Sequence, residues 1–70
     1  MTRFKAIFVY VQELVESEVG SSYGLSAKTK DEAENEALAM VPPSGANFVK
    51  ILDEGMVVSR VGISHDADRA

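Results

Sequence analysis

The sequence contains no cysteine, and its 70 residues include a single histidine, His65. Without cysteine, the chain has neither disulfide bonds nor thiolate ligands for a metal ion. A domain this short buries a small core, so packing, well-made turns or a second copy of the chain must stabilise it. No apolar run approaches the roughly 20 residues that span a bilayer, and no leader segment is recognisable. We therefore expect a soluble cytoplasmic protein that does not bind membranes.

Basic residues are also few, since seven lysines and arginines stand against eleven acids and give a net charge of −4. Residues 13–36 are the acidic part of the chain, where the cations are Lys28 and Lys30. Direct binding of nucleic acid needs lysines and arginines to displace counterions, so this composition argues against it. It favours a protein partner with a basic surface. The alternative is that the acids only keep a small domain soluble.

Groups that carry catalysis are scarce as well. Ser64, His65 and Asp66 have the residue types of a catalytic triad, but adjacent residues cannot converge on one reacting atom as a triad does. His65, Asp66 and Asp68 could hold a divalent ion loosely, although a polar tail explains them better. The five glycines match neither a dinucleotide fingerprint nor a phosphate loop. We expect no enzymatic activity, no cofactor and no metal site.

The first segment is rich in aromatic and β-branched residues, which predicts a strand over residues 3–15. A polar connection over residues 16–20 and an edge strand over residues 21–28 follow it. Alternation gives the first strand two apolar faces, which is typical of a central strand. One face holds Phe4, Ala6, Phe8, Tyr10 and Leu14, and the other holds Ile7, Val9, Val11 and Val15.

The strongest local pattern predicts a helix over residues 29–41. Thr29 and Glu32 have the spacing of a capping box, in which the hydroxyl accepts from the Glu32 amide and the glutamate reaches back. Two prolines, at positions 42 and 43, end the helix. The expected sheet-facing stripe consists of Ala33, Ala37, Met40 and Val41.

Two further strands are predicted over residues 48–52 and 56–63, with a three-residue turn in which Gly55 is left-handed. In this register Lys50 and Arg60 share one face with Phe48, Leu52 and Val58. A two-residue turn would shift the pairing. The opposite face is expected to hold Val49, Ile51, Val57, Val61 and Ile63.

The order β-β-α-β-β predicts an α+β fold, a four-stranded antiparallel sheet of order 2-1-3-4 with one helix on one face. Residues 1–63 would form the single domain and residues 64–70 a flexible tail. One helix leaves the second face of the sheet uncovered, and Ile7, Val9 and Val11 would lie there. A homodimer through this face, or a protein partner, would cover it.

Carboxylates along one side of such a domain can imitate a phosphate backbone and occupy a lysine-lined groove. The alternative is that they form an ordinary capped and solvated helix surface. The residues that we expect to bind a partner are Glu13, Glu16, Glu18, Asp31, Glu32, Glu34 and Glu36.

Two resemblances add to this interpretation. The segment AKTKDEAENEAL, in which Thr29, Glu32 and Ala33 lead into the helix, resembles HicB-type antitoxins. By size, acidity and element order, the whole chain is similar to small phage-encoded anti-CRISPR proteins directed at type I surveillance complexes. That resemblance implies a non-catalytic inhibitor that binds a Cas subunit in the host cytoplasm and blocks DNA binding. The alternative is an antitoxin or regulatory subunit, or a small dimeric interaction module.

Overall fold

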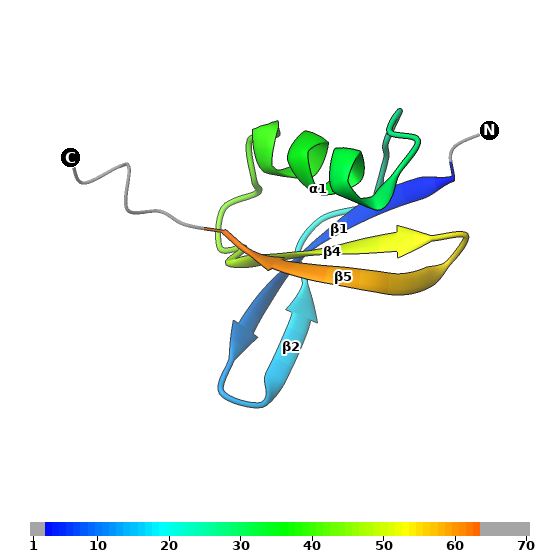
Figure 1. Cartoon of the computed structure of the whole chain (residues 1–70). Coiled ribbons are helices and arrows are strands. Elements are labelled where there is room, and N and C mark those ends of the chain that lie inside the picture. Colours follow the sequence, from blue (N-terminus) through cyan, green and yellow to red (C-terminus); the bar gives the residue numbers. More distant parts are fainter. Residues whose placement is uncertain (1–2, 64–70) are drawn as a thin grey trace.

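The computed structural model describes residues 3–63, which form one helix against one face of an antiparallel sheet (Figure 1). The α+β architecture predicted from the sequence is confirmed. The strand order is β2-β1-β4-β5, and β3 also pairs with β1. The elements are β1 (Phe4–Gln12), β2 (Val15–Glu18), β3 (Tyr23–Gly24), α1 (Lys30–Ala39), β4 (Phe48–Asp53) and β5 (Met56–Gly62).

The predicted second strand, residues 21–28, is reduced to β3, and β2 is an additional short strand on the same edge of β1, so residues 3–63 form five strands and not four. The C-terminal part of β1 pairs with β2, and its N-terminal part, at Lys5 and Ala6, pairs with β3. Gly20 lies between them with φ +79°, a conformation that glycine adopts without strain. The chain bends there, which interrupts the edge that we predicted to be one strand.

The first turn lies earlier than predicted. Gln12 pairs with Val15, so Glu13 and Leu14 form a two-residue turn, and residues 16–18 already belong to the returning strand. Such turns are marked by glycine or asparagine, and this one has neither. The residues of the actual turn, Glu13 and Leu14, therefore do not indicate a turn, whereas Gly20 indicates the later bend.

The faces of β1 agree with prediction at Phe4, Ala6 and Phe8, which are buried under α1. Beyond Phe8 this face leaves the core: Tyr10 keeps its predicted face but is 41% exposed, and the prediction is wrong for Leu14, which lies at the exposed turn and not in β1. The second face also differs, because Val9 is fully buried and its neighbours on that face, Ile7 and Val11, are half-buried. The expected open apolar patch on β1 is thus largely covered within the chain.

Helix α1 begins as predicted, with Thr29 as the N-cap, whose hydroxyl accepts a hydrogen bond from the Glu32 amide. It ends at Ala39, earlier than predicted, because Met40 is already extended at ψ 152°. Pro42 disfavours a helical conformation at Val41, which is 91% exposed and not part of the buried stripe.

The core between α1 and the sheet combines small helix residues with large sheet residues. Ala33 and Ala37 are the buried residues of α1, and their size lets the helix approach the strands closely. Large side chains from β1, β4 and the segment after β3 fill the space beneath. They include Phe4, Phe8, Leu25, Val49 and Ile51.

The β4–β5 hairpin does not have the predicted register, although several residues lie on their predicted faces. Its turn has two residues, Glu54 and Gly55, both with positive φ, and Asp53 pairs with Met56. Val58 is then an extra residue, since Leu52 pairs with Val57 and Ile51 with Ser59. This β-bulge restores the faces that a three-residue turn would have produced, but not the pairs: with Asp53–Gly55 as the turn, Lys50 would lie opposite Val58 and not opposite Arg60.

The consequence for the faces is mixed. Lys50 pairs with Arg60 and Val49 with Val61, so the members of each pair share a face, as predicted. Val57 lies opposite Leu52 on the face of Lys50, which contradicts its predicted place beside Ile51. The predicted tail, residues 64–70, lies outside the described residues.

Candidate functional site

The seven carboxylates predicted to bind a partner fall into two groups that the fold keeps apart. Four lie on α1, and three lie on the β1–β2 hairpin, at the turn and along β2. In Figure 1 this hairpin extends from the sheet on the side away from α1. The structure therefore does not bring the seven residues into one cluster.

Two of the helix carboxylates hold α1 to the segment before it. Glu32 accepts a hydrogen bond from the Lys28 amide at 3.0 Å, which completes the cap one residue before Thr29. Glu36 accepts from the Ser26 amide at 3.1 Å through both oxygens and from the Ser26 hydroxyl at 3.2 Å. These contacts satisfy backbone groups that the short edge strand leaves unpaired.

The other two helix carboxylates differ from each other. Glu34 accepts a hydrogen bond from the Ser59 hydroxyl, which joins α1 to β5, and lies 4.0 Å from the Lys30 ammonium. Asp31 has no hydrogen bond or ion pair within residues 3–63, and it lies in the first turn, where the helix dipole favours an acid.

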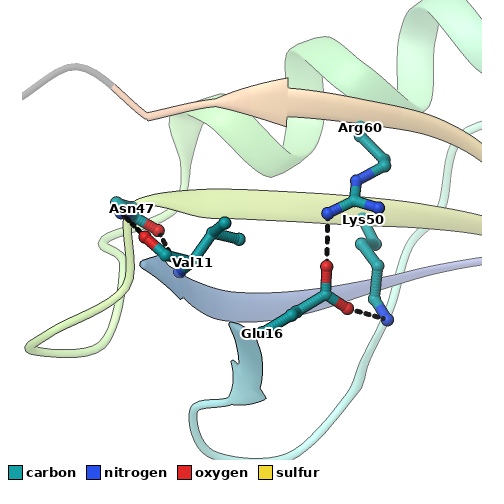
Figure 2. A network of polar contacts seen from close by, with 5 residues as sticks. All are labelled: Val11, Glu16, Asn47, Lys50 and Arg60. Carbon is teal, nitrogen blue, oxygen red and sulfur yellow. Dashed lines mark hydrogen bonds and ion pairs between the residues drawn. The ribbon is translucent and has the colours of Figure 1, made fainter. Parts of the chain in front are cut away.

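On the hairpin, Glu16 is tied to the sheet by two cations on adjacent strands (Figure 2). Its carboxylate is 2.8 Å from the Lys50 ammonium on β4 and also contacts the Arg60 guanidinium on β5. The hydrogen bond from Lys50, together with the charges of Lys50 and Arg60, lowers the pKa of Glu16 although partial burial opposes the shift. The ion pairs hold β2 against the sheet face that α1 leaves open.

Asn47 forms a second attachment for the hairpin. Its side-chain oxygen accepts from the Val11 amide at 2.8 Å, and its side-chain nitrogen donates to the Val11 carbonyl at 2.9 Å (Figure 2). The Asn47 main-chain amide also donates to the Val9 carbonyl at 2.9 Å. The side chain thus pairs with β1 as a further strand residue would, just before β4 begins.

Between these attachments and the solvent lies the end of the hairpin, formed by Gln12, Glu13, Leu14 and Val15, which we call the hairpin tip. Leu14 is 100% exposed and Val15 67% exposed. Glu13 has φ +56°, a left-handed conformation that costs a residue with a side chain about 1–2 kcal/mol. The four residues line a shallow surface depression. The turn thus presents two consecutive apolar side chains, Leu14 and Val15, to solvent beside a strained backbone position.

Sequence reasoning missed the residues that position this tip. The sequence predicts that Lys50 and Arg60 share one face, but it also predicts Glu16 in the first turn, where it would not lie next to them. Asn47 lies between the predicted helix and the strand predicted from residue 48, where the sequence indicates no contact with β1. An asparagine directly before an apolar strand was the available signal, but it is equally typical of loops.

Residues 3–63 contain no group of three or more acidic or histidine side chains arranged to hold a metal ion. Their one helix is neither long nor apolar enough to cross a membrane. His65, Asp66 and Asp68, which the sequence favours as part of a polar tail and not as a metal site, lie outside the described residues. Comparison with protein-family models, with curated proteins and with solved structures finds no match to this chain.

Proposed function

We propose that this chain is a non-catalytic protein-binding protein whose contact surface is the hairpin tip. The observation that carries the proposal is the complete exposure of Leu14 at the end of a hairpin that is fastened at both of its strands. Asn47 fastens β1 and the Lys50–Glu16 pair fastens β2. A surface held in place before binding loses less conformational freedom when the partner arrives.

The chemistry of the tip defines the kind of partner. Leu14 and Val15 offer exposed apolar side chains. Removing them from water in a pocket of the partner makes the free energy of binding more favourable. The Glu13 carboxylate lies beside them in the same turn, and it has no hydrogen bond or ion pair within residues 3–63. The complementary surface is an apolar pocket with a lysine or arginine at its rim, since opposite charges steer and align the two proteins.

The test uses a photo-reactive residue in place of Leu14, with Val41 as the matched control position. Both side chains are apolar and exposed, at 100% and 91%. In the native host cell, the reactive group at position 14 should cross-link one defined protein, and the group at position 41 should not. The purified partner should then bind the Leu14→Asn variant at least about tenfold more weakly than the native chain. Equal affinity for the two chains would overturn the proposal.

Glu13 gives a second test, because its carboxylate and its strained backbone have opposite effects. Glu13→Gly should stabilise the fold by about 0.5–1 kcal/mol, since glycine accepts φ +56° without strain. It should also weaken partner binding, because the charge at the tip is lost. Glu54, with φ 53° in the other turn, is the matched control: Glu54→Gly should stabilise similarly without changing affinity. Urea unfolding and titration calorimetry measure the two effects, and equal affinities for both variants would remove Glu13 from the binding surface.

A finer form of the proposal follows from the resemblance to type I anti-CRISPR proteins. In this form the partner is a nucleic-acid-binding Cas subunit with a basic surface, and occupation of that surface blocks DNA binding. Titrating the chain into a purified type I surveillance complex, with labelled target DNA, measures the effect directly. The alternative role as a HicB-like antitoxin predicts instead that the chain co-purifies with a toxin and neutralises it. Leu14→Asn should reduce the observed activity in either case.

A further inference from the structure

The sheet has one long unpaired edge within residues 3–63, and it belongs to β5. The opposite edge of the sheet is formed by β2 and β3, which are four and two residues long and are separated by the bend at Gly20. β5 runs over seven residues, and its outer side is not covered by another strand (Figure 1). An unpaired edge offers a row of backbone donors and acceptors to another strand.

The backbone groups on this edge can be assigned from the ladder. The Ile63 amide donates to the Asn47 carbonyl at 2.9 Å, so it points toward the sheet. The backbone N–H and C=O groups of successive residues in an antiparallel strand point to opposite sides. The backbone groups of Val61 therefore also point toward β4, and those of Arg60 and Gly62 point away from the sheet. The outward groups of these two residues therefore form the pairable part of the edge beyond the bulge at Val58.

β5 has few of the features that usually prevent an edge strand from pairing with another chain. β5 has no proline and no lysine, and its one charged residue is Arg60. The Arg60 guanidinium is drawn toward Glu16 on the open face of the sheet, away from the line of the backbone. The bulge at Val58 twists the first part of β5 but leaves residues 59–62 in a regular ladder with β4.

We propose that this edge pairs with the same edge of a second copy of the chain, antiparallel and centred on Val61. In this register Arg60 lies opposite Gly62 of the second copy, so the long side chain meets a residue without one. Val61 lies opposite its own equivalent, which makes an apolar cross-strand pair on the helix side. A register centred on Arg60 would set two guanidinium groups opposite each other, which is unfavourable. The edge is thus self-complementary in one register, as a two-fold dimer requires.

The flank of α1 above β5 fits the same arrangement. Glu34 contacts Ser59, so this flank faces the β5 side of the molecule, and Leu38 lies one turn further along it with 48% of its surface exposed. A two-fold axis perpendicular to the sheet places both helices on the same face. The same flank holds a cation and an anion, Lys30 and Glu34. Because the two copies run in opposite directions, the Lys30 of one copy can approach the Glu34 of the other. The contact is small, and the dimer is expected to dissociate on dilution.

The experiment compares the native chain with Gly62→Pro and Gly62→Ala. Proline removes the outward amide of residue 62 and spares the inward amides of Val61 and Ile63. Alanine keeps the amide, and its Cβ would lie in ordinary contact, 3.5 Å from the Phe48 ring. Sedimentation over a wide concentration range should show a reversible dimer for the native chain and for Gly62→Ala, and a monomer for Gly62→Pro, with circular dichroism reporting the fold of each. A native chain that stays monomeric, or a folded Gly62→Pro variant that dimerises like the native chain, would overturn the proposal.

A measurement on the unmodified protein covers the case in which Gly62→Pro does not fold. Amide exchange should show that the Arg60 and Gly62 amides become more protected as the protein concentration rises, whereas the Val61 amide is protected throughout. Fast exchange of both outward amides at high concentration would contradict the pairing. It would leave the edge open to a strand from another protein, which is a different arrangement from the one proposed.

Discussion

At the scale of single residues, Asn47 shows how one side chain can continue a sheet where the backbone cannot. Its amide group has a donor and an acceptor side by side, as a peptide unit does, and both are used by Val11. The sequence predicts a strand from residue 48, so Asn47 is expected directly before it, as the structure shows. It could not show that the side chain turns back to β1, because that contact spans 36 positions of the chain.

Replacement of Asn47 tests the importance of this pairing. Asn47→Ala leaves the half-buried Val11 amide and carbonyl without their partner and should destabilise the fold by about 1–3 kcal/mol. Asn47→Asp keeps the acceptor but loses the donor, so its stability should lie between those of the native chain and Asn47→Ala. Asn35→Ala, at an exposed helix position, is the control and should stay within about 0.5 kcal/mol of the native chain. Urea unfolding followed by circular dichroism measures all three, and an unaffected Asn47→Ala would show that water replaces the side chain.

At the scale of elements, the sequence predicted the helix and the second hairpin better than the first hairpin. Helix α1 has a start signal in Thr29 and Glu32 and a stop signal in Pro42, so the local sequence predicts its start and its approximate end. The turn at Glu13 and Leu14 lacks glycine, and only the pairing of β1 with β2 makes it favourable. The hairpin tip was therefore beyond local rules, although Glu13 itself was among the predicted residues.

The attachment of the first hairpin should respond to pH. The pKa of Glu16 is lowered below its ordinary value of 4.5 by Lys50 and Arg60, so the folded state binds a proton there less readily than the unfolded state. This contribution to stability is fully present above pH 4.5 and is lost as the pH falls through the lowered pKa. Asp53, whose pKa is lowered by the hydrogen bond and charge of Arg3, adds a loss in the same direction at lower pH.

Glu16→Gln isolates this effect. The variant should be less stable than the native chain at neutral pH, and the difference should shrink as the solution is made more acidic than pH 4.5. Glu18→Gln, one alternation along the same strand and without an ion pair within residues 3–63, should show no such convergence. Thermal melts across an acidic pH series give the comparison. Parallel profiles for the native chain and Glu16→Gln would mean that the ion pairs do not stabilise the fold.

At the scale of the whole molecule, the core is small enough that one side chain decides whether the chain folds. Phe8 is 1% exposed and meets the Tyr23 ring edge-on, with 5.7 Å between the ring centroids. A chain of this length has a total stability of roughly 4–10 kcal/mol. Phe8→Ala should cost about 3–5 kcal/mol, which is a large part of that total. Phe8→Leu, which keeps most of the volume, should remain folded, and thermal unfolding distinguishes the two; a cost below about 1 kcal/mol for Phe8→Ala would show that the core closes around the gap.

The second hairpin has a consequence for how the chain tolerates changes of length. The turn at Glu54 and Gly55 is one residue shorter than predicted, and Val58 supplies one residue more than the ladder uses. Removing Val58 would join two stretches that already have compatible alignment, so that Leu52 would still face Val57 and Ile51 would still face Ser59. Deletion of Val58 should therefore leave the faces of the remaining β5 residues unchanged. Deletion of Arg60, between Ser59 and Val61, would instead move every following side chain of β5 to the opposite face of the sheet.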